Sequence, residues 1–168
     1  MSVENDQFYA FLVASLGLLA IVIVIGLLSI RVINKRKFML WALLVEYLFL
    51  VVCATVVCRQ PLPKPHLQLS PLWVYTDFLH THQKEAVKDI VVNLLLFLPI
   101  GALLDGLYPS LKWYQALLIG LACSLTIEVA QYAFMRGIAQ TDDVIHNAGS
   151  CLVGWGGTRM VVGRSRLN

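Results

Sequence analysis

The sequence predicts an all-α membrane protein: a bundle of five transmembrane helices with a short additional helix lying at the outer interface. Of the 168 residues, 58% are hydrophobic and only 14% are charged, whereas a soluble domain carries about 25% charged residues. The apolar residues are also grouped in long runs instead of alternating at the period of a strand or of an amphipathic helix. Such runs approach the roughly 20 residues that a helix needs to cross a bilayer. We expect residues 1–168 to form one transmembrane domain.

The first two predicted spans and the loop between them set the orientation. Residues 8–30 are apolar and uncharged. This run is longer than the apolar core of a cleaved signal peptide, so we predict a transmembrane helix there. A basic cluster follows at residues 31–37, and a second span is predicted at residues 38–57. Because cytoplasmic loops are rich in Lys and Arg, the chain is expected to begin outside and, after five spans, to end in the cytoplasm.

The segment between the second and third spans, residues 59–86, is predicted to hold the interfacial helix. Its first part contains several prolines and cannot be helical throughout. Ser70 followed by Pro71 then predicts a helix start, because serine caps helix N-termini and proline fits the first helical position. The residues that follow mix aromatic with polar side chains and are too few to cross a bilayer. We therefore expect a helix that lies along the outer interface.

Three further apolar runs complete the predicted bundle. They are residues 87–104, 113–135 and 144–162. Small residues recur every four positions in the last two runs, at Ala116, Gly120 and Ser124 and again at Ser150 and Gly154. This spacing lets helices approach closely in a membrane, so we expect these spans to pack directly against their neighbours.

Polar and ionisable side chains gather in the outer halves of the last three predicted spans. Such groups are costly inside a membrane and mark functional sites when they occur there. Side chains four residues apart share a helix face. The pairs at this spacing are Ser124 with Glu128, Asp142 with His146, and Asp143 with Asn147. We expect these faces, together with Asn93, to form one pocket where the third, fourth and fifth spans meet, open to the outside beneath the interfacial helix.

The ionisable residues of this pocket are candidates for catalysis. They are Glu128, Asp142, Asp143 and His146. A buried Glu128 would act as an acid or base beside an ionised Asp142 or Asp143. His146 would relay protons or bind a metal ion. A divalent cation on the three carboxylates fits their chemistry, but no motif of a metal site supports it.

Further polar residues are candidates for substrate binding. They are Lys88, Asn93, Ser124, Gln131, Arg136 and Asn147. The cationic side chains of Lys88 and Arg136 would hold a phosphate or a carboxylate. Ser124 is not predicted to be a nucleophile, because it lies in an ordinary helix without the sharp turn that exposes a catalytic serine.

Three motifs follow one another along the second half of the chain. They are N-x-x-x-F-x-P-x-G from Asn93 to Gly101, S-x-x-x-E-x-x-Q from Ser124 to Gln131, and RG followed by TDDVIHN-x-G from Arg136 to Gly149, with Gly154 beyond. In order and spacing they resemble the VanZ-like family of small bacterial membrane proteins, over about residues 40–160. Ala148 stands where that family usually has threonine.

This resemblance implies a polytopic protein of the bacterial inner membrane. The family is named for an accessory protein of glycopeptide resistance that lowers susceptibility to teicoplanin-type antibiotics. Those antibiotics carry a lipid tail and act at the outer membrane surface on lipid-linked cell-wall precursors. The resemblance therefore implies membrane lipids as partners, with a lipid-linked precursor or a lipoglycopeptide as the molecule bound.

Several functions fit these features. The first is a membrane-embedded enzyme or binding protein for an amphiphile in the outer leaflet, such as an undecaprenyl-linked head group. The second is a non-catalytic membrane factor that binds a drug or a partner protein, with the polar side chains only joining helices. A transporter ranks last, because polar groups confined to one leaflet leave no path across. The net charge of +3 is too small to indicate nucleic-acid binding, and neither a cofactor nor an oligomeric state is predicted.

Overall fold

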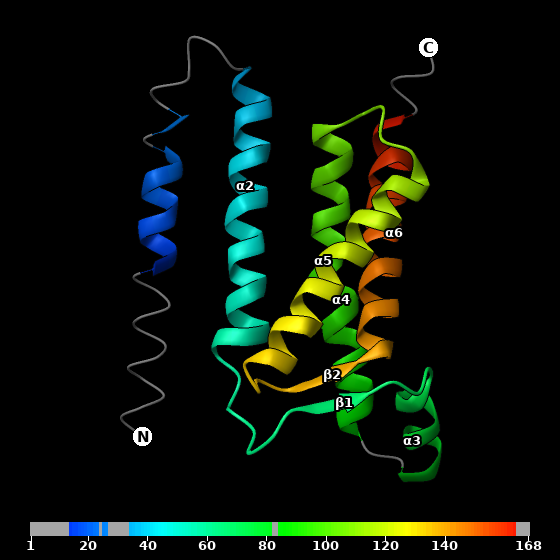
Figure 1. Ribbon diagram of the computed structural model, residues 1–168. Helices are drawn as coiled ribbons and strands as arrows, with labels where there is room; N and C mark the ends of the chain where they lie inside the picture. The colour runs from blue at the N-terminus through cyan, green and yellow to red at the C-terminus, as the bar shows by residue number, and fades with distance from the viewer. Residues whose placement is uncertain (1–13, 24, 27–33, 82–83, 164–168) are drawn as a thin grey trace. The chain divides into compact units, whose positions relative to one another are not determined.

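The computed structural model describes residues 14–23, 25–26, 34–81 and 84–163 (Figure 1). The chain divides into two compact units, Met1–Arg59 and Gln60–Asn168. Within the described ranges all the regular structure is helical except for one pair of short strands. The predicted all-α class is therefore confirmed.

The first unit contains one helix that is long and apolar enough to cross a membrane. Helix α2 (Lys35–Val52) continues into the π-helical turn η1 (Cys53–Val57), and together they form a candidate span. The side chain of Asn34 caps the start of α2 by accepting a hydrogen bond from Arg36 N at 2.9 Å. This helix confirms the predicted second span. Of the predicted first span, Ala14–Ile23 is a short apolar helix, and the remainder lies mostly outside the described residues.

The second unit is a three-helix bundle of α4 (Lys84–Leu107), α5 (Trp113–Ala133) and α6 (Thr141–Gly163). Candidate spans cover Ile90–Leu107 and Trp113–Ala133. Helix α6 is long enough to cross a membrane but is not among the candidate spans. The described helices thus support three of the five predicted spans. Polar side chains in the first half of α6 lower its hydropathy. These side chains are buried within the protein.

Helix α6 packs along both α4 and α5 (Figure 1), and glycines allow the close approach. A Cβ atom on Gly101 of α4 would collide with the Cys151 carbonyl, and one on Gly154 of α6 would collide with the Leu98 carbonyl. On α5, a Cβ atom on Gly120 would lie 2.7 Å from the Cβ atom of Cys151. The predicted close packing at Gly120 and Gly154 is confirmed.

Two short strands cross one end of this bundle, which we call the strand end. Strand β1 (His66–Gln68) pairs in parallel with β2 (Ile138–Gln140), with His66 opposite Ile138. The pair was not predicted, because three-residue strands have no recognisable period. It joins the segment before α3 to the segment before α6 (Figure 1).

Helix α3 (Trp73–Thr81) also lies at the strand end (Figure 1) and corresponds to the predicted interfacial helix. Its predicted start at Ser70 and Pro71 is wrong. Pro71 and Leu72 form a turn, and Leu72 has a φ of 62°, which is outside the helical region. The helix begins at Trp73, and a side chain of α6 binds the amides at its start, as described below.

Candidate functional site

Asp142, in the first turn of α6, holds the start of α3. Its carboxylate oxygens accept hydrogen bonds from Leu72 N at 2.5 Å and from Val74 N at 2.9 Å. The side chain is only 2% exposed. The first amides of a helix have no partner within the helix, and a carboxylate there also complements the helix dipole. Asp142 therefore acts as a cap for a helix about 70 residues earlier in the chain, a role that the local sequence does not reveal.

His146, one turn after Asp142, makes a second contact with α3. Its Nε2 atom and the hydroxyl of Tyr75 are hydrogen bonded at 2.7 Å, and the two rings meet edge to face with centroids 5.6 Å apart. Within the described residues, Nδ1 of His146 is buried and has no hydrogen-bond partner. Tyr75 was not among the predicted site residues, because an interfacial aromatic side chain carries no signal of its partner. The spacing of Asp142 and His146 places both on the face of α6 that contacts α3.

Asn147 and Ser150 join α6 to the other two helices. Asn147 Nδ2 donates to Ser124 Oγ of α5 at 2.9 Å, and Ser150 Oγ donates to the Leu94 carbonyl of α4. Asn93, beside Leu94, is buried as well. Four residues, Asn93, Ser124, Asn147 and Ser150, thus lie at one level of the bundle, and we call them the polar layer. Hydrogen bonds of this kind between membrane helices contribute about 0.6 kcal/mol each on average.

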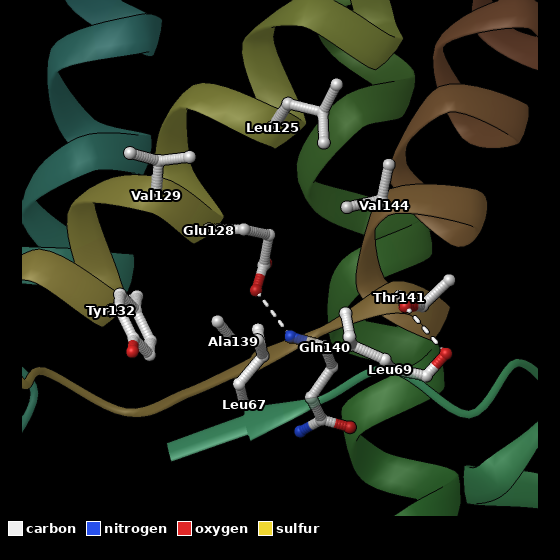
Figure 2. A pocket seen from close by; sticks show the side chains of 10 residues that line it. All are labelled: Leu67, Leu69, Leu125, Glu128, Val129, Tyr132, Ala139, Gln140, Thr141 and Val144. Carbon is white, nitrogen blue, oxygen red and sulfur yellow. Dashed lines mark hydrogen bonds between the residues drawn. The ribbon is translucent and has the colours of Figure 1, made fainter. Parts of the chain in front are cut away.

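Glu128 faces a pocket of about 230 Å³ instead of the polar layer (Figure 2). The pocket is bounded by α5, the two strands and the start of α6. Its lining residues are Leu67, Leu69, Leu125, Glu128, Val129, Tyr132, Ala139, Gln140, Thr141 and Val144. The walls are therefore mostly apolar.

The carboxylate of Glu128 is attached to strand β2. Its Oε2 atom accepts a hydrogen bond from Gln140 N at 2.7 Å (Figure 2), and the side chain is 7% exposed. On the other side of the pocket, Thr141 Oγ donates to the Leu69 carbonyl at 3.2 Å. The strand pair thus connects the two walls, and Glu128 has a defined position in one of them.

The family model VanZ/LLP1 matches residues 38–162 of the chain. The chain belongs to the VanZ/LLP1 family. The match includes α3, α4, α5, most of α2 and nearly all of α6, together with the polar layer and the pocket. It confirms the resemblance drawn from the motifs and, with the apolar helices, identifies a membrane protein. No curated protein and no solved structure matches the chain.

The VanZ/LLP1 bundle places the remaining predicted site residues around the strand end, but outside the pocket. Asp143 and Gln131 are buried, and Arg136 is half-buried. Arg136 N donates to the Gln131 carbonyl at 2.8 Å, which connects the end of α5 to the turn that leads to β2. Lys88 is exposed near the start of α4. Of the predicted residues, Glu128 alone is among those that line the pocket.

The described part of the VanZ/LLP1 chain brings together no group of three or more His, Cys, Asp or Glu side chains that could hold a metal ion. Asp142 and Glu128 are bonded to the backbone of different segments, α3 and β2. The carboxylates considered for a cation therefore have separate structural partners. The geometry favours binding of an apolar group beside a carboxylate.

Proposed function

We propose that this VanZ-like membrane protein binds an amphiphilic molecule of the cell envelope at the extracytoplasmic side of the bacterial inner membrane. The observation that supports this proposal is the pocket, whose walls are mostly apolar and include the carboxylate of Glu128. Binding pockets for small molecules share this character, with mostly apolar walls and a few placed polar groups. The bound molecule would be a lipid-linked cell-wall precursor or a lipoglycopeptide of the teicoplanin type, and the protein would contribute to resistance by binding it.

The pocket is of a size for part of such a molecule. Its volume of about 230 Å³ is below the range of about 300–1,000 Å³ that is usual for a complete drug-sized ligand. A segment of an acyl or isoprenoid chain with one polar group attached would fill it, while the rest of the molecule would lie outside. An amphiphile anchored in a membrane can bind in this partial manner.

The proposed orientation puts the strand end on the outer side. The basic residues 31–37 mark a cytoplasmic loop by the positive-inside rule, so the second span leads outward to β1 and α3. Arg159, at the opposite end of α6, pairs with Asp105 at 3.2 Å and donates to the Pro109 carbonyl. A basic residue at that end agrees with a cytoplasmic C-terminus.

The proposal is tested by photo-crosslinking. The full chain would be reconstituted in lipid nanodiscs with an alkyl probe that carries a diazirine, and labelled peptides would be identified by mass spectrometry. We expect enriched labelling of residues 125–132, and its loss in Val129→Trp, because a tryptophan would fill the pocket. Val153→Trp is the matched control, since Val153 lies on α6 away from the lining residues and is 62% exposed, against 65% for Val129. Equal labelling along all helices, unchanged by Val129→Trp, would refute the proposal.

A second candidate is a non-catalytic factor that binds a partner protein, with the polar residues serving only to join helices. The bonds of Asn147 to Ser124 and of Asp142 to α3 support the structural role of the polar residues in this second candidate, because these bonds connect helices directly. Glu128→Gln separates these functions from catalysis. If proton transfer by Glu128 is required, this variant folds and inserts but loses the resistance phenotype.

A further inference from the structure

We infer that the pocket opens sideways into the bilayer, and that its ligand is a lipid already resident in the outer leaflet. The chain of this lipid would enter past Leu125, Val129 and Tyr132 of α5. The inference rests on the proposed function, because it assumes that the pocket holds an amphiphile. It goes further by choosing the source of that molecule, since a lipid-linked molecule of the membrane is favoured over an amphiphile that arrives from water.

The mouth of the pocket consists of large, mainly apolar side chains. Five of the lining residues are between 44% and 66% exposed, namely Leu67, Leu69, Leu125, Val129 and Tyr132. Side chains that line a hollow and are also this exposed lie at its edge. Leu125, Val129 and Tyr132 follow α5 along one side of the pocket (Figure 2). Leu67 lies in β1 and Leu69 directly after it, so they form the edge on the strand side.

The floor of the pocket is buried and carries its charged group. Glu128 is 7% exposed and Ala139 is 2% exposed, and the Glu128 carboxylate accepts from Gln140 N. A mouth open to water would place its large apolar side chains against water, which is unfavourable. Contiguous exposed apolar side chains instead mark a surface that contacts a membrane or a partner. In a chain with membrane-spanning helices, the mouth therefore faces lipid.

The mouth is continuous with an exposed apolar stripe along α5. Leu125, Val129 and Tyr132 stand at positions i, i+4 and i+7, and Leu118, one heptad before Leu125, is also exposed. Residues at these spacings share one face of a helix. Helix α5 is itself a candidate membrane span. A lipid chain that lies along this face would reach the pocket without leaving the bilayer.

The position of Tyr132 indicates how such a lipid would lie. Tyr132 is the last residue but one of α5, and tyrosine is favoured where the bilayer core meets water. Leu125 lies seven residues earlier, or about 10 Å along the helix. The polar group of the lipid would therefore lie near Tyr132 and its chain against Val129 and Leu125. The pocket of about 230 Å³ would hold a segment of the chain, while the remainder stays in the bilayer.

The test compares two diazirine probes on the wild-type full chain in lipid nanodiscs. One is a phosphatidylglycerol with the diazirine in the middle of an acyl chain, which stays in the bilayer. The other is a water-soluble glycoside whose short alkyl chain carries the same diazirine. Labelling is measured at Glu128 and Ala139, because lipid that only surrounds the helices does not reach the buried floor. We expect the lipid to label both residues and the glycoside to label them no more than Cys151, which is buried between helices.

Substitution at the mouth tests the route of entry. Val129→Trp should abolish labelling of the floor by the lipid, because the larger side chain would obstruct the mouth. Val153→Trp is the matched control, since Val153 is similarly exposed on α6 but does not line the pocket. The control should keep the wild-type labelling of the floor.

Two further lipid probes test the proposed position of the chain. One carries the diazirine close to the ester and the other at the end of the acyl chain. We expect the first to label Tyr132 more than Leu125, and the second to label Leu125 more than Tyr132. The opposite order, or no difference, would overturn the inference.

The remaining results separate the inference from the proposed function. Labelling of the floor by the glycoside, alone or as strong as by the lipid, would overturn the inference and leave the proposed function intact. Unchanged labelling of the floor in Val129→Trp would also overturn it. If that variant does not fold, the comparison of the two probes on the wild type still decides. Absence of floor labelling by every probe would instead refute the proposed function itself.

Discussion

Replacement of Asp142 is expected to release the first turn of α3 from α6. In the wild type, both oxygens of this carboxylate accept hydrogen bonds from backbone amides, those of Leu72 and Val74. Asp142→Asn keeps one acceptor oxygen and puts an NH₂ group, which cannot accept, in the place of the other. Asp142→Ala removes both acceptors. The two variants therefore form a graded series at one position.

The burial of each amide sets the expected magnitude. Leu72 is exposed, so its N–H can bond to water once the carboxylate is lost, whereas Val74 is only 6% exposed and has no such replacement. Loss of a helix cap costs about 1–2 kcal/mol, which changes an equilibrium about 5- to 30-fold. We expect this effect for Asp142→Asn. For Asp142→Ala, a buried donor is also left without a partner, which raises the cost to about 2–4 kcal/mol.

Hydrogen–deuterium exchange measures this effect directly. Exchange of the α3 amides should accelerate in the order wild type, Asp142→Asn, Asp142→Ala, while the amides in the middle of α5 keep their wild-type rates. Those α5 amides serve as the internal control, because Asp142 binds amides at the start of α3, whereas α5 is bonded to α6 through Ser124 and Asn147. Unchanged exchange in α3 for both variants would refute the capping role. Equal acceleration in α3 and α5 would show a general loss of stability instead.

Two other predictions concern contacts of α6. Tyr75→Phe removes the hydroxyl bonded to His146 and should weaken the attachment of α3 by about 1 kcal/mol. We expect faster hydrogen–deuterium exchange in α3 and no change in the unfolding temperature of the bundle. A lower unfolding temperature would contradict this local role. Gly101→Ala should destabilise the bundle by about 1–3 kcal/mol, because its Cβ atom would collide with the Cys151 carbonyl. The same substitution at Gly157, which has open space beside it, is the control, and equal unfolding temperatures of the two variants would contradict the packing argument.

The helices could be predicted because a membrane restricts what an apolar segment can do. A long run without charges can satisfy its backbone hydrogen bonds in a bilayer only as a helix or in a closed barrel. The run predicted at 113–135 is accordingly α5 (Trp113–Ala133), and the run predicted at 38–57 lies within α2 and η1. The small residues Gly120 and Gly154 likewise indicated close packing, because their spacing by itself places them on a helix face.

The polar segments were less predictable. The last span was expected to begin at residue 144, but α6 begins at Thr141, and the residues directly before it form strand β2. Similarly, a serine and a proline indicated a helix start at Ser70, but α3 begins at Trp73. In each case a contact with a distant segment outweighed the local preference for a cap or a turn.

The sequence by itself determined the membrane class, the family, the approximate positions of the long helices and the clustering of polar residues at one end. Only the tertiary structure decided what each polar residue contacts. Asp142 binds amides 68 and 70 residues away, and Glu128 faces an apolar pocket instead of the polar layer. The physical reason is that apolar runs act through their own length and composition, whereas the role of a hydrogen-bonding group depends on the partner that the fold places beside it.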